Sequence, residues 1–353
     1  MKILLKLFLS IFIVALVACV DRFDPKLTGG IPYIIFEGTL TDQLGPHYFN
    51  LSYSAGYNSN ESVFDKTVNA AKIWITDAKN VRTDLIDLSK GKFSTPEGFR
   101  GQIGNSYQVH IQLSDGTSYS SKAETMRYSP PIDKVYTEFK LTTTLQPKHR
   151  GNFNVYLNVK DPATEGDFYR WKWVNYEIAT SCANYIVTGD RPSIFYKKCC
   201  GDCWNINSCL GCINLASDNL VNGKTLPKQF IAQIPFDNIT SYYMLIEQMS
   251  LSREAYNYWK SVDEQANNSG GIFDTASATI RGNIKNVNDE SEVILGYFQI
   301  SAVTQKAVYI QRNNLGIFPF GFNIGGNYNF ATECETCKES PYRTSKRPLN
   351  WVN

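Results

Sequence analysis

Alternating apolar and polar residues form the most frequent pattern along this chain, and that pattern predicts short β-strands. It is clearest at residues 107–113, where every second side chain from Tyr107 to Leu113 is apolar. Asp115-Gly116 follows, a dipeptide suited to the positive φ angles of a tight hairpin turn. Residues 117–121 then return as the partner strand, so the pair is predicted to be antiparallel.

Further strand-like stretches precede this hairpin. Residues 33–36, 48–53 and 72–76 are rich in aromatic and β-branched residues and are separated by polar turns. Short strands spaced in this way, without a helical period, are typical of small antiparallel sandwiches. We therefore predict an Ig-like or prealbumin-like β-sandwich over residues 31–129.

A second β-rich domain is predicted to begin at Pro130-Pro131, because two prolines cannot donate to a sheet and they stiffen the chain. Alternation resumes at residues 153–159, and residues 168–178 form the return strand. In that strand Trp171 and Trp173 lie two apart and share a face, which indicates core packing. This domain is expected to cover residues 130–353.

One helix is predicted within the second domain, over residues 252–266. Ser252 can cap its first turn, and Glu254 suits the positive end of its dipole. Apolar residues recur at helical spacing, at Ala255, Trp259 and Val262. Asparagines and glycines over residues 267–271 end the pattern.

These patterns predict a mainly β protein of two antiparallel sandwich-like domains, the second with one inserted helix and a Cys-rich excursion at residues 182–212. Aromatic residues are abundant, with 21 Tyr, 20 Phe and 6 Trp. Packing on pleated sheets accounts for many of them. An aromatic wall that binds a ligand is the alternative, and both interpretations stay open.

The first residues are typical of a bacterial leader. Lys2 and Lys6 flank the start of an apolar run that reaches residue 17, shorter than the about 20 apolar residues that a membrane-spanning helix needs. Leu16 and Ala18 precede Cys19 as in the bacterial lipobox, where the thiol is acylated and the peptide before it is removed. We expect a signal peptide over residues 1–18.

Cys19 is therefore the expected lipid anchor, carrying acyl chains such as palmitate. Residues 19–30 would then be a lipidated tether, and its eleven residues after the cysteine span at most about 36 Å when extended. The first domain would stay close to the membrane surface. An uncleaved anchor, or an ordinary signal peptide followed by an unrelated cysteine, is the alternative.

The charge balance argues against nucleic acid as a partner. The chain has 35 basic and 33 acidic residues, and removal of the two leader lysines leaves 33 of each sign. No stretch after the leader has 18 apolar residues without charge, so no transmembrane helix is predicted. The expected membrane contact is the N-terminal lipid alone.

Several stretches together resemble the DUF-4249 lipoproteins of Bacteroidota, a family without an assigned reaction. Besides the lipobox, they are residues 70–75, 114–121, 131–133, 281–284 and 295–298. The resemblance covers nearly the whole mature chain, and the order and spacing of the stretches carry it. It implies an outer-membrane lipoprotein on the cell surface or the periplasmic face, often encoded near a TonB-dependent receptor, and it gives no catalytic residues to carry over.

Eight cysteines remain after Cys19, and they are Cys182, Cys199, Cys200, Cys203, Cys209, Cys212, Cys334 and Cys337. An even number in an oxidising compartment predicts a disulfide framework, although 105 pairings are possible. The favoured scheme closes residues 199–212 into a knot and links Cys334 or Cys337 back to it.

Zinc is the competing interpretation of these cysteines, because three Cys-x-x-Cys pairs occur. The first two pairs are close for a shared metal, so a zinc site would use Cys209, Cys212, Cys334 and Cys337. A redox role comes third, since no thioredoxin-like pattern surrounds any pair.

Catalytic motifs are not found in the sequence. The three histidines are His47, His110 and His149, and His110 is expected to be solvated on the polar side of its strand. Asp289-Glu290 with Glu292 is the densest acidic group, interpreted as a solvated turn rather than a glycosidase pair or a calcium loop. No cofactor is predicted.

The leading functional hypothesis is a non-enzymatic accessory or ligand-binding lipoprotein that works beside a TonB-dependent β-barrel transporter. A glycan- or peptide-acting hydrolase whose carboxylates meet only in the fold is one alternative. A structural envelope-assembly protein is the other.

Overall fold

The computed structural model describes residues 32–54, 68, 71–144, 148–179, 181–188, 193–209, 211–219, 222–268, 279–320 and 330–352. The predicted signal peptide, Cys19 and the tether over residues 19–30 lie outside this part of the chain. Within it, no helix has both the length and the apolar character needed to cross a membrane. The predicted fold class is confirmed, since the described residues form mainly antiparallel sheets with a single helix.

The first sandwich consists of two sheets that enclose one hydrophobic core. One sheet contains β1 (Ile34–Thr41), β2 (Tyr48–Tyr53), β5 (Ile86–Asp87), β6 (Lys92–Ser94) and β20 (Phe298–Ser301). The other contains β3 (Lys72–Asp77), β4 (Arg82–Asp84), β7 (Ser106–Gln112), β8 (Ser118–Ser121), β9 (Glu124–Thr125) and β19 (Ile284–Asn286). Their inward residues alternate with outward ones, as the pattern of β7 predicts, and Phe36, Val109 and Phe298 are fully buried between the sheets.

The predicted hairpin is present, and β7 pairs with β8 so that His110 faces Ser120. Two strands of this sandwich come from much later in the chain. β20 adds in parallel to β1, and β19 adds to β8. Residues 284–302 therefore complete the first core, although the sequence alone placed them with the second domain.

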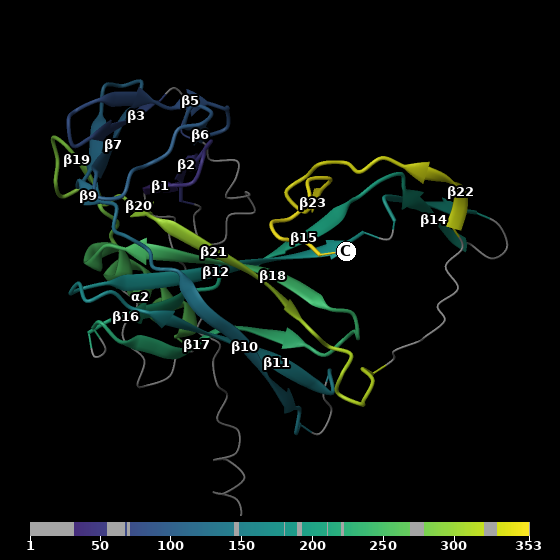
Figure 1. The fold of residues 1–353 in the computed structure, drawn as a ribbon. Helices are drawn as coiled ribbons and strands as arrows, with labels where there is room; N and C mark the ends of the chain where they lie inside the picture. Colours follow the sequence, from purple (N-terminus) through teal and green to yellow (C-terminus); the bar gives the residue numbers. More distant parts are fainter. Residues whose placement is uncertain are drawn as a thin grey trace, which may run out of the picture.

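The second sandwich lies below the first in Figure 1. Its smaller sheet contains β10 (Ile132–Leu141), β11 (Gly151–Lys160) and β17 (Thr225–Pro235). Its larger sheet contains β12 (Phe168–Ile178), β15 (Trp204–Ser208), β16 (Asn214–Ser217), β18 (Tyr242–Leu251), β21 (Val303–Ile310) and β23 (Arg343–Thr344). Trp171 and Trp173 both pack in its core, as predicted.

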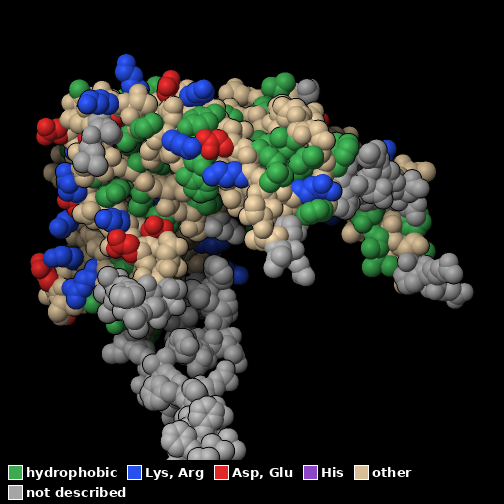
Figure 2. All heavy atoms as spheres, turned by 90° about the horizontal axis from the view of Figure 1, so that it is seen from below, with side chains coloured by type: hydrophobic (Ala, Val, Ile, Leu, Met, Phe, Trp, Pro, Cys, Tyr) green, Lys and Arg blue, Asp and Glu red, His purple; other side chains and the backbone are tan. Residues whose placement is uncertain are grey.

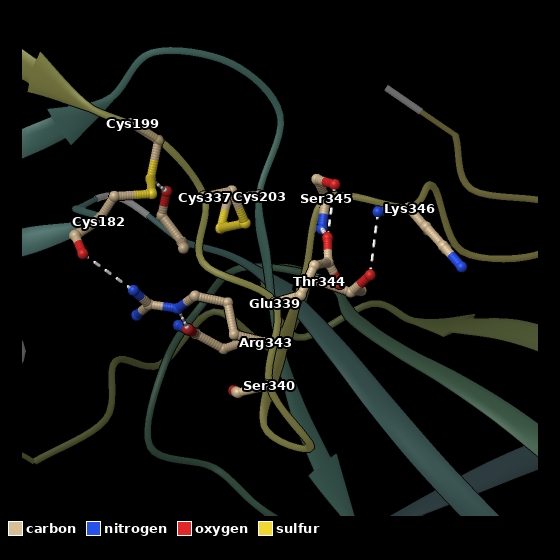
Figure 3. The surroundings of a disulfide bond; sticks show 12 residues. Cys182, Cys199, Cys203, Cys337, Glu339, Ser340, Arg343, Thr344, Ser345 and Lys346 are labelled. Carbon is tan, nitrogen blue, oxygen red and sulfur yellow. Dashed lines mark hydrogen bonds between the residues drawn. A yellow bond between two sulfur atoms is a disulfide. The ribbon is translucent and has the colours of Figure 1, made fainter.

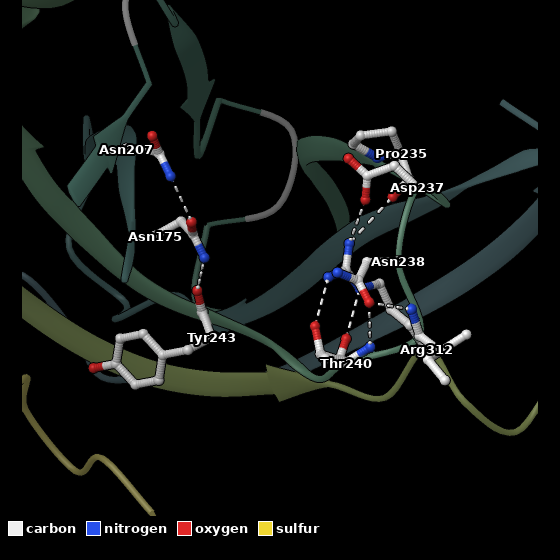
Figure 4. A network of polar contacts seen from close by, with 9 residues as sticks. Asn175, Asn207, Pro235, Asp237, Asn238, Thr240, Tyr243 and Arg312 are labelled. Carbon is white, nitrogen blue, oxygen red and sulfur yellow. Dashed lines mark hydrogen bonds and ion pairs between the residues drawn. The ribbon is translucent and has the colours of Figure 1, made fainter. Parts of the chain in front are cut away.

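Buried polar groups fix the strands of this sandwich to each other (Figure 4). Asn175 is fully buried and donates to the Tyr243 carbonyl at 2.7 Å, while Asn207 donates to Asn175 Oδ1 at 3.1 Å. Arg312 is also buried and forms an ion pair with Asp237 at 2.8 Å. Because each group has a partner, the desolvation cost of burying it is offset.

A small third sheet projects from the second sandwich at the right of Figure 1. It contains β13 (Ala183–Val187), β14 (Ser193–Cys199) and β22 (Phe330–Glu335). β22 adds in parallel to β14, so the end of the chain closes the Cys-rich excursion.

Helix α2 (Arg253–Asn267) agrees closely with its predicted range. The Ser252 hydroxyl accepts a hydrogen bond from Ala255 N at 3.0 Å and caps the first turn. Ala255 is buried, and Trp259 donates to Gln299 at 2.7 Å, which places α2 against β20. The helix therefore lies at the junction of the two sandwiches.

Candidate ligand-binding cleft

A hollow of about 1060 Å³ opens at this junction, and we call it the junction cleft. One wall is a face of α2, one is the end of the first sandwich at residues 122–127, and one is the returning segment at residues 279–285. The charged side chains that line it are Lys122, Glu124, Arg127, Arg253, Glu254, Glu264, Arg281 and Lys285. Its size fits a small-molecule or short oligomeric ligand.

The polar face of α2 forms the first wall. Six of the helical residues that line the cleft fall at positions i, i+3, i+4, i+7, i+10 and i+11, and they are Glu254, Asn257, Tyr258, Ser261, Glu264 and Gln265. This spacing places them on one side of the helix, while Ala255 faces the core. The same amphipathic pattern that positions α2 therefore also lines the cleft with hydrogen-bonding groups.

Glu124 lies at the inner wall, where residues from two distant segments meet it. The Tyr297 hydroxyl donates to Glu124 Oε1, and Asn283 Nδ2 donates to the same oxygen at 3.3 Å. Asn283 also bridges to β20, because it donates to the Phe298 carbonyl at 2.9 Å and accepts from Phe298 N at 3.0 Å. Two of the stretches that carry the family resemblance, residues 281–284 and 295–298, thus meet at one carboxyl.

Burial sets the protonation of Glu124. Its side chain is only 6% exposed, and its Oε2 atom has no hydrogen-bond partner among the described residues. Burial raises the pKa of Glu124 to about 7, against the opposing hydrogen bonds from Tyr297 and Asn283. A carboxyl that titrates near neutral pH at the wall of a cleft is a candidate functional group.

Two glycines allow the returning segment to reach this position. A Cβ on Gly282 would lie 1.6 Å from the carbonyl oxygen of Gly296. Gly296 itself has φ +84° and lies so close to β1 that a Cβ would be 2.1 Å from the Phe36 carbonyl oxygen. Only glycine fits at either position, so both belong to the geometry that presents Asn283 and Tyr297 to Glu124.

A second, smaller hollow of about 300 Å³ shares Tyr258 and Tyr297 with the junction cleft. These two rings lie 4.7 Å apart, and Trp259 and Lys172 complete the neighbouring wall. Burial lowers the pKa of Lys172 to about 8, and the nearby Arg170 guanidinium lowers it further. An aromatic surface with a basic group therefore adjoins the cleft.

Basic side chains outnumber acidic ones around the junction cleft, five to three. Arg127 forms an ion pair with Asp167 at 3.3 Å, and Lys285 forms one with Glu290 at 3.2 Å. Lys122, Arg253 and Arg281 form no ion pair within the described residues, although Arg253 stacks on Phe168. The cleft therefore offers unpaired cations to a ligand.

All eight cysteines of the excursion and the tail are in disulfides, and Figure 3 shows the Cys182–Cys199 and Cys203–Cys337 bonds. Cys182 bonds Cys199, Cys200 bonds Cys334, Cys203 bonds Cys337, and Cys209 bonds Cys212. Arg343 lies against them and donates to the Cys182 carbonyl at 3.2 Å. The zinc set Cys209, Cys212, Cys334 and Cys337 is not brought together, because three different disulfides use its members.

Exposed apolar side chains gather on the hairpin of β13 and β14. Tyr185, Ile186, Val187 and Ile194 are all exposed there. Figure 2 shows hydrophobic side chains at this projecting end, while charged side chains are concentrated at the opposite end. β13 is also an edge strand of its sheet within the described chain, and such an edge can pair with another strand.

The remaining sequence candidates do not line the junction cleft. His110 is half-buried rather than solvated, since it stacks on Trp74 and shares a hydrogen bond with Thr76 at 2.9 Å. Asp289 is exposed and accepts hydrogen bonds from Ser291 in the predicted turn. Glu124, which the sequence analysis missed, sits in a short stretch with no motif around it.

The fold and the cleft define a mainly β protein of two sandwich cores with an open polar cleft between them. The chain belongs to the family described as "Domain of unknown function (DUF4249)", whose sequence profile matches residues 20–307. The match covers the first core, most of the second core and the cleft, whereas Cys334 and Cys337 lie beyond it. Among curated proteins, none matches the chain.

Proposed function

We propose that this chain is a lipid-anchored outer-membrane lipoprotein that binds an anionic ligand in the junction cleft, as a non-enzymatic accessory of a TonB-dependent transporter. The observation that carries the binding role is the cleft itself, with its excess of basic over acidic side chains. Cations without ion-pair partners at the surface of a concave site attract and orient anionic groups.

An acidic saccharide is the ligand class that the lining favours. Arg253 and Arg281 supply planar guanidinium groups, which match carboxylates. Asn257, Ser261 and Gln265 supply hydrogen-bonding groups for hydroxyls, and Tyr258 supplies an aromatic edge between the two hollows.

The lipobox at Leu16, Ala18 and Cys19 supports the membrane anchor. The projecting hairpin supports a protein partner, because an edge strand with exposed apolar side chains suits pairing with another chain. Together with the short tether, the lipobox and the projecting hairpin support a role beside a membrane-embedded protein rather than as a free periplasmic protein.

Titration with oligogalacturonate, a neutral oligosaccharide and inorganic phosphate tests the cleft. We expect the oligogalacturonate to bind and the paired substitution Arg253→Gln, Arg281→Gln to weaken that binding at least tenfold. Arg100→Gln is the matched control, since Arg100 is exposed and does not line the cleft. Equal binding by both variants, or no binding of any anionic probe to the unmodified protein, would refute the cleft as the site.

Hydrolysis of an acidic glycan is the second candidate, and Glu124 is the observation that favours it. Its carboxyl, with a pKa of about 7, faces the cleft that Glu254 also lines. Release of new reducing ends from polygalacturonate, abolished by Glu124→Gln, would establish the enzyme. Binding without such release supports the accessory role.

A further inference from the structure

Three buried aspartates meet at one end of the second sandwich. Asp161 follows β11, Asp167 precedes β12, and Asp218 follows β16. They are 3%, 6% and 1% exposed, and one carboxylate oxygen from each lies within 4.8 Å of the others. Three carboxylates at this spacing repel one another strongly when they are out of water.

Protein groups satisfy only part of this cluster. Asp161 accepts hydrogen bonds from the Tyr169 hydroxyl at 2.6 Å and from Gly223 N at 3.2 Å. Asp218 Oδ2 accepts from Gly166 N at 2.9 Å, but Asp218 Oδ1 is buried without any partner in the described chain. An unpartnered carboxylate oxygen inside an acidic cluster is costly unless something positive binds it.

Among the described residues, Arg127 is the cation that forms an ion pair with the cluster, and it compensates a single charge. Arg127 donates to Asp167 Oδ1 at 3.3 Å and to the Gly166 carbonyl at 2.8 Å, and its side chain is 42% exposed. Asp167 Oδ2 accepts from the Thr164 hydroxyl at 2.5 Å. Negative charge therefore remains in excess at this position.

We propose that Asp161, Asp167 and Asp218 bind one Ca²⁺ ion. All the donors are oxygens, which is the ligand set of a hard cation. Two oxygens that bind the same Ca²⁺ at 2.3–2.6 Å lie at most about 5 Å apart. The carboxylate oxygens of the three aspartates lie within 4.8 Å of one another, which agrees with this spacing. The ion supplies the positive charge that Arg127 alone does not.

Bound Ca²⁺ joins two parts of the chain that are far apart in the sequence, residues 161–167 and Asp218. The first of these parts contacts the wall of the junction cleft, because Gly166 and Asp167 hold Arg127. The ion therefore stabilises the second sandwich and fixes Arg127 in place. The proposed Ca²⁺ site does not depend on the ligand proposed for the junction cleft, and the two proposals are tested by separate experiments.

Binding of Ca²⁺ to the chelator-treated mature chain tests the proposal directly. Calorimetry is expected to give one Ca²⁺ per chain, with a rise in the thermal unfolding midpoint that Mg²⁺ at equal concentration does not match. Tb³⁺ in place of Ca²⁺ is expected to luminesce on excitation of the protein, since the Tyr169 hydroxyl touches Asp161. Absence of both signals, or an equal response to Mg²⁺, overturns the assignment.

Asp218→Asn separates a metal site from a merely structural cluster. The amide keeps an oxygen for Gly166 N and removes one negative charge, so without Ca²⁺ the variant should unfold at the same midpoint as the unmodified chain or higher. Its Ca²⁺ affinity should fall at least tenfold. Asp289→Asn, in the exposed acidic turn, is the matched control and should bind Ca²⁺ normally. Normal Ca²⁺ binding by Asp218→Asn together with reduced binding by Asp289→Asn overturns the proposal. If Asp218→Asn does not fold, the Ca²⁺ and Tb³⁺ results on the unmodified chain decide.

Discussion

At neutral pH the carboxyl of Glu124 is close to half-protonated, because burial raises its pKa to about 7. In the unfolded chain the same group titrates near its ordinary pKa of 4.5. Between these two values the folded state holds a proton that the unfolded state has lost, so stability falls as the pH rises. The expected loss is about 3 kcal/mol from pH 4.5 to pH 8.

Glu124→Gln is expected to remove this pH dependence, since the amide stays neutral in both states. Urea unfolding at pH 5 and pH 8 measures it, and the variant should gain stability relative to the unmodified chain at the higher pH. Glu264→Gln, exposed on α2 and also lining the cleft, is the matched control. A variant that follows the same pH profile as the unmodified chain would show that Glu124 is not a buried acid.

The burial of Glu124 and its place at the cleft could not be predicted from the sequence. Its environment comes from Asn283 and Tyr297, which are 159 and 173 residues away in the chain. By contrast, Ser252 predicts its own role, because a helix cap depends on neighbours within one turn. Residue roles set by local spacing were predictable here, and roles set by tertiary contact were not.

Two disulfides join the excursion to the tail, and they make a prediction at the scale of elements. Cys200–Cys334 and Cys203–Cys337 each span 134 residues and lie side by side. Removing one leaves the other to close almost the same loop, so a Cys→Ser pair at either bond should cost roughly 2 kcal/mol. Removing both opens the long loop and should cost about 5 kcal/mol more.

Urea unfolding followed by Trp fluorescence measures this, because Trp351 of the tail packs against Trp204 and Tyr243. Cys209→Ser with Cys212→Ser is the control, since that bond spans three residues and leaves the tail attached. Strictly additive losses from the two long-range bonds would contradict the shared-loop account.

Strand patterns and the helix were predictable from the sequence because each depends on its own periodicity. The hairpin of β7 and β8 and the bounds of α2 are examples. The parallel addition of β20 to β1 was not predictable, because the pairing joins Gly38 to Phe298 and no local pattern records such a contact. Gly282 and Gly296 are the residues in the sequence that reflect this pairing, because backbones approach each other closely at both positions.

For the whole molecule, β19 and β20 make the two sandwiches interdependent. The chain leaves the first core after Met126, builds the second, and returns through residues 284–302 to finish the first. The junction cleft lies along this return, so its walls come from both sandwiches. Ligand binding there would stabilise both sandwiches together.

We propose that the mature chain is anchored through Cys19 and works beside a β-barrel transporter. The most direct measurement is recovery of the full-length protein from membranes in a mild detergent, with mass spectrometry of its N-terminus and of the proteins that accompany it. We predict fatty acyl chains on Cys19 as the first residue and enrichment of a TonB-dependent β-barrel that a Cys19→Ala variant does not retain. An unlipidated N-terminus, or a lipidated protein with no β-barrel partner, would contradict the claim.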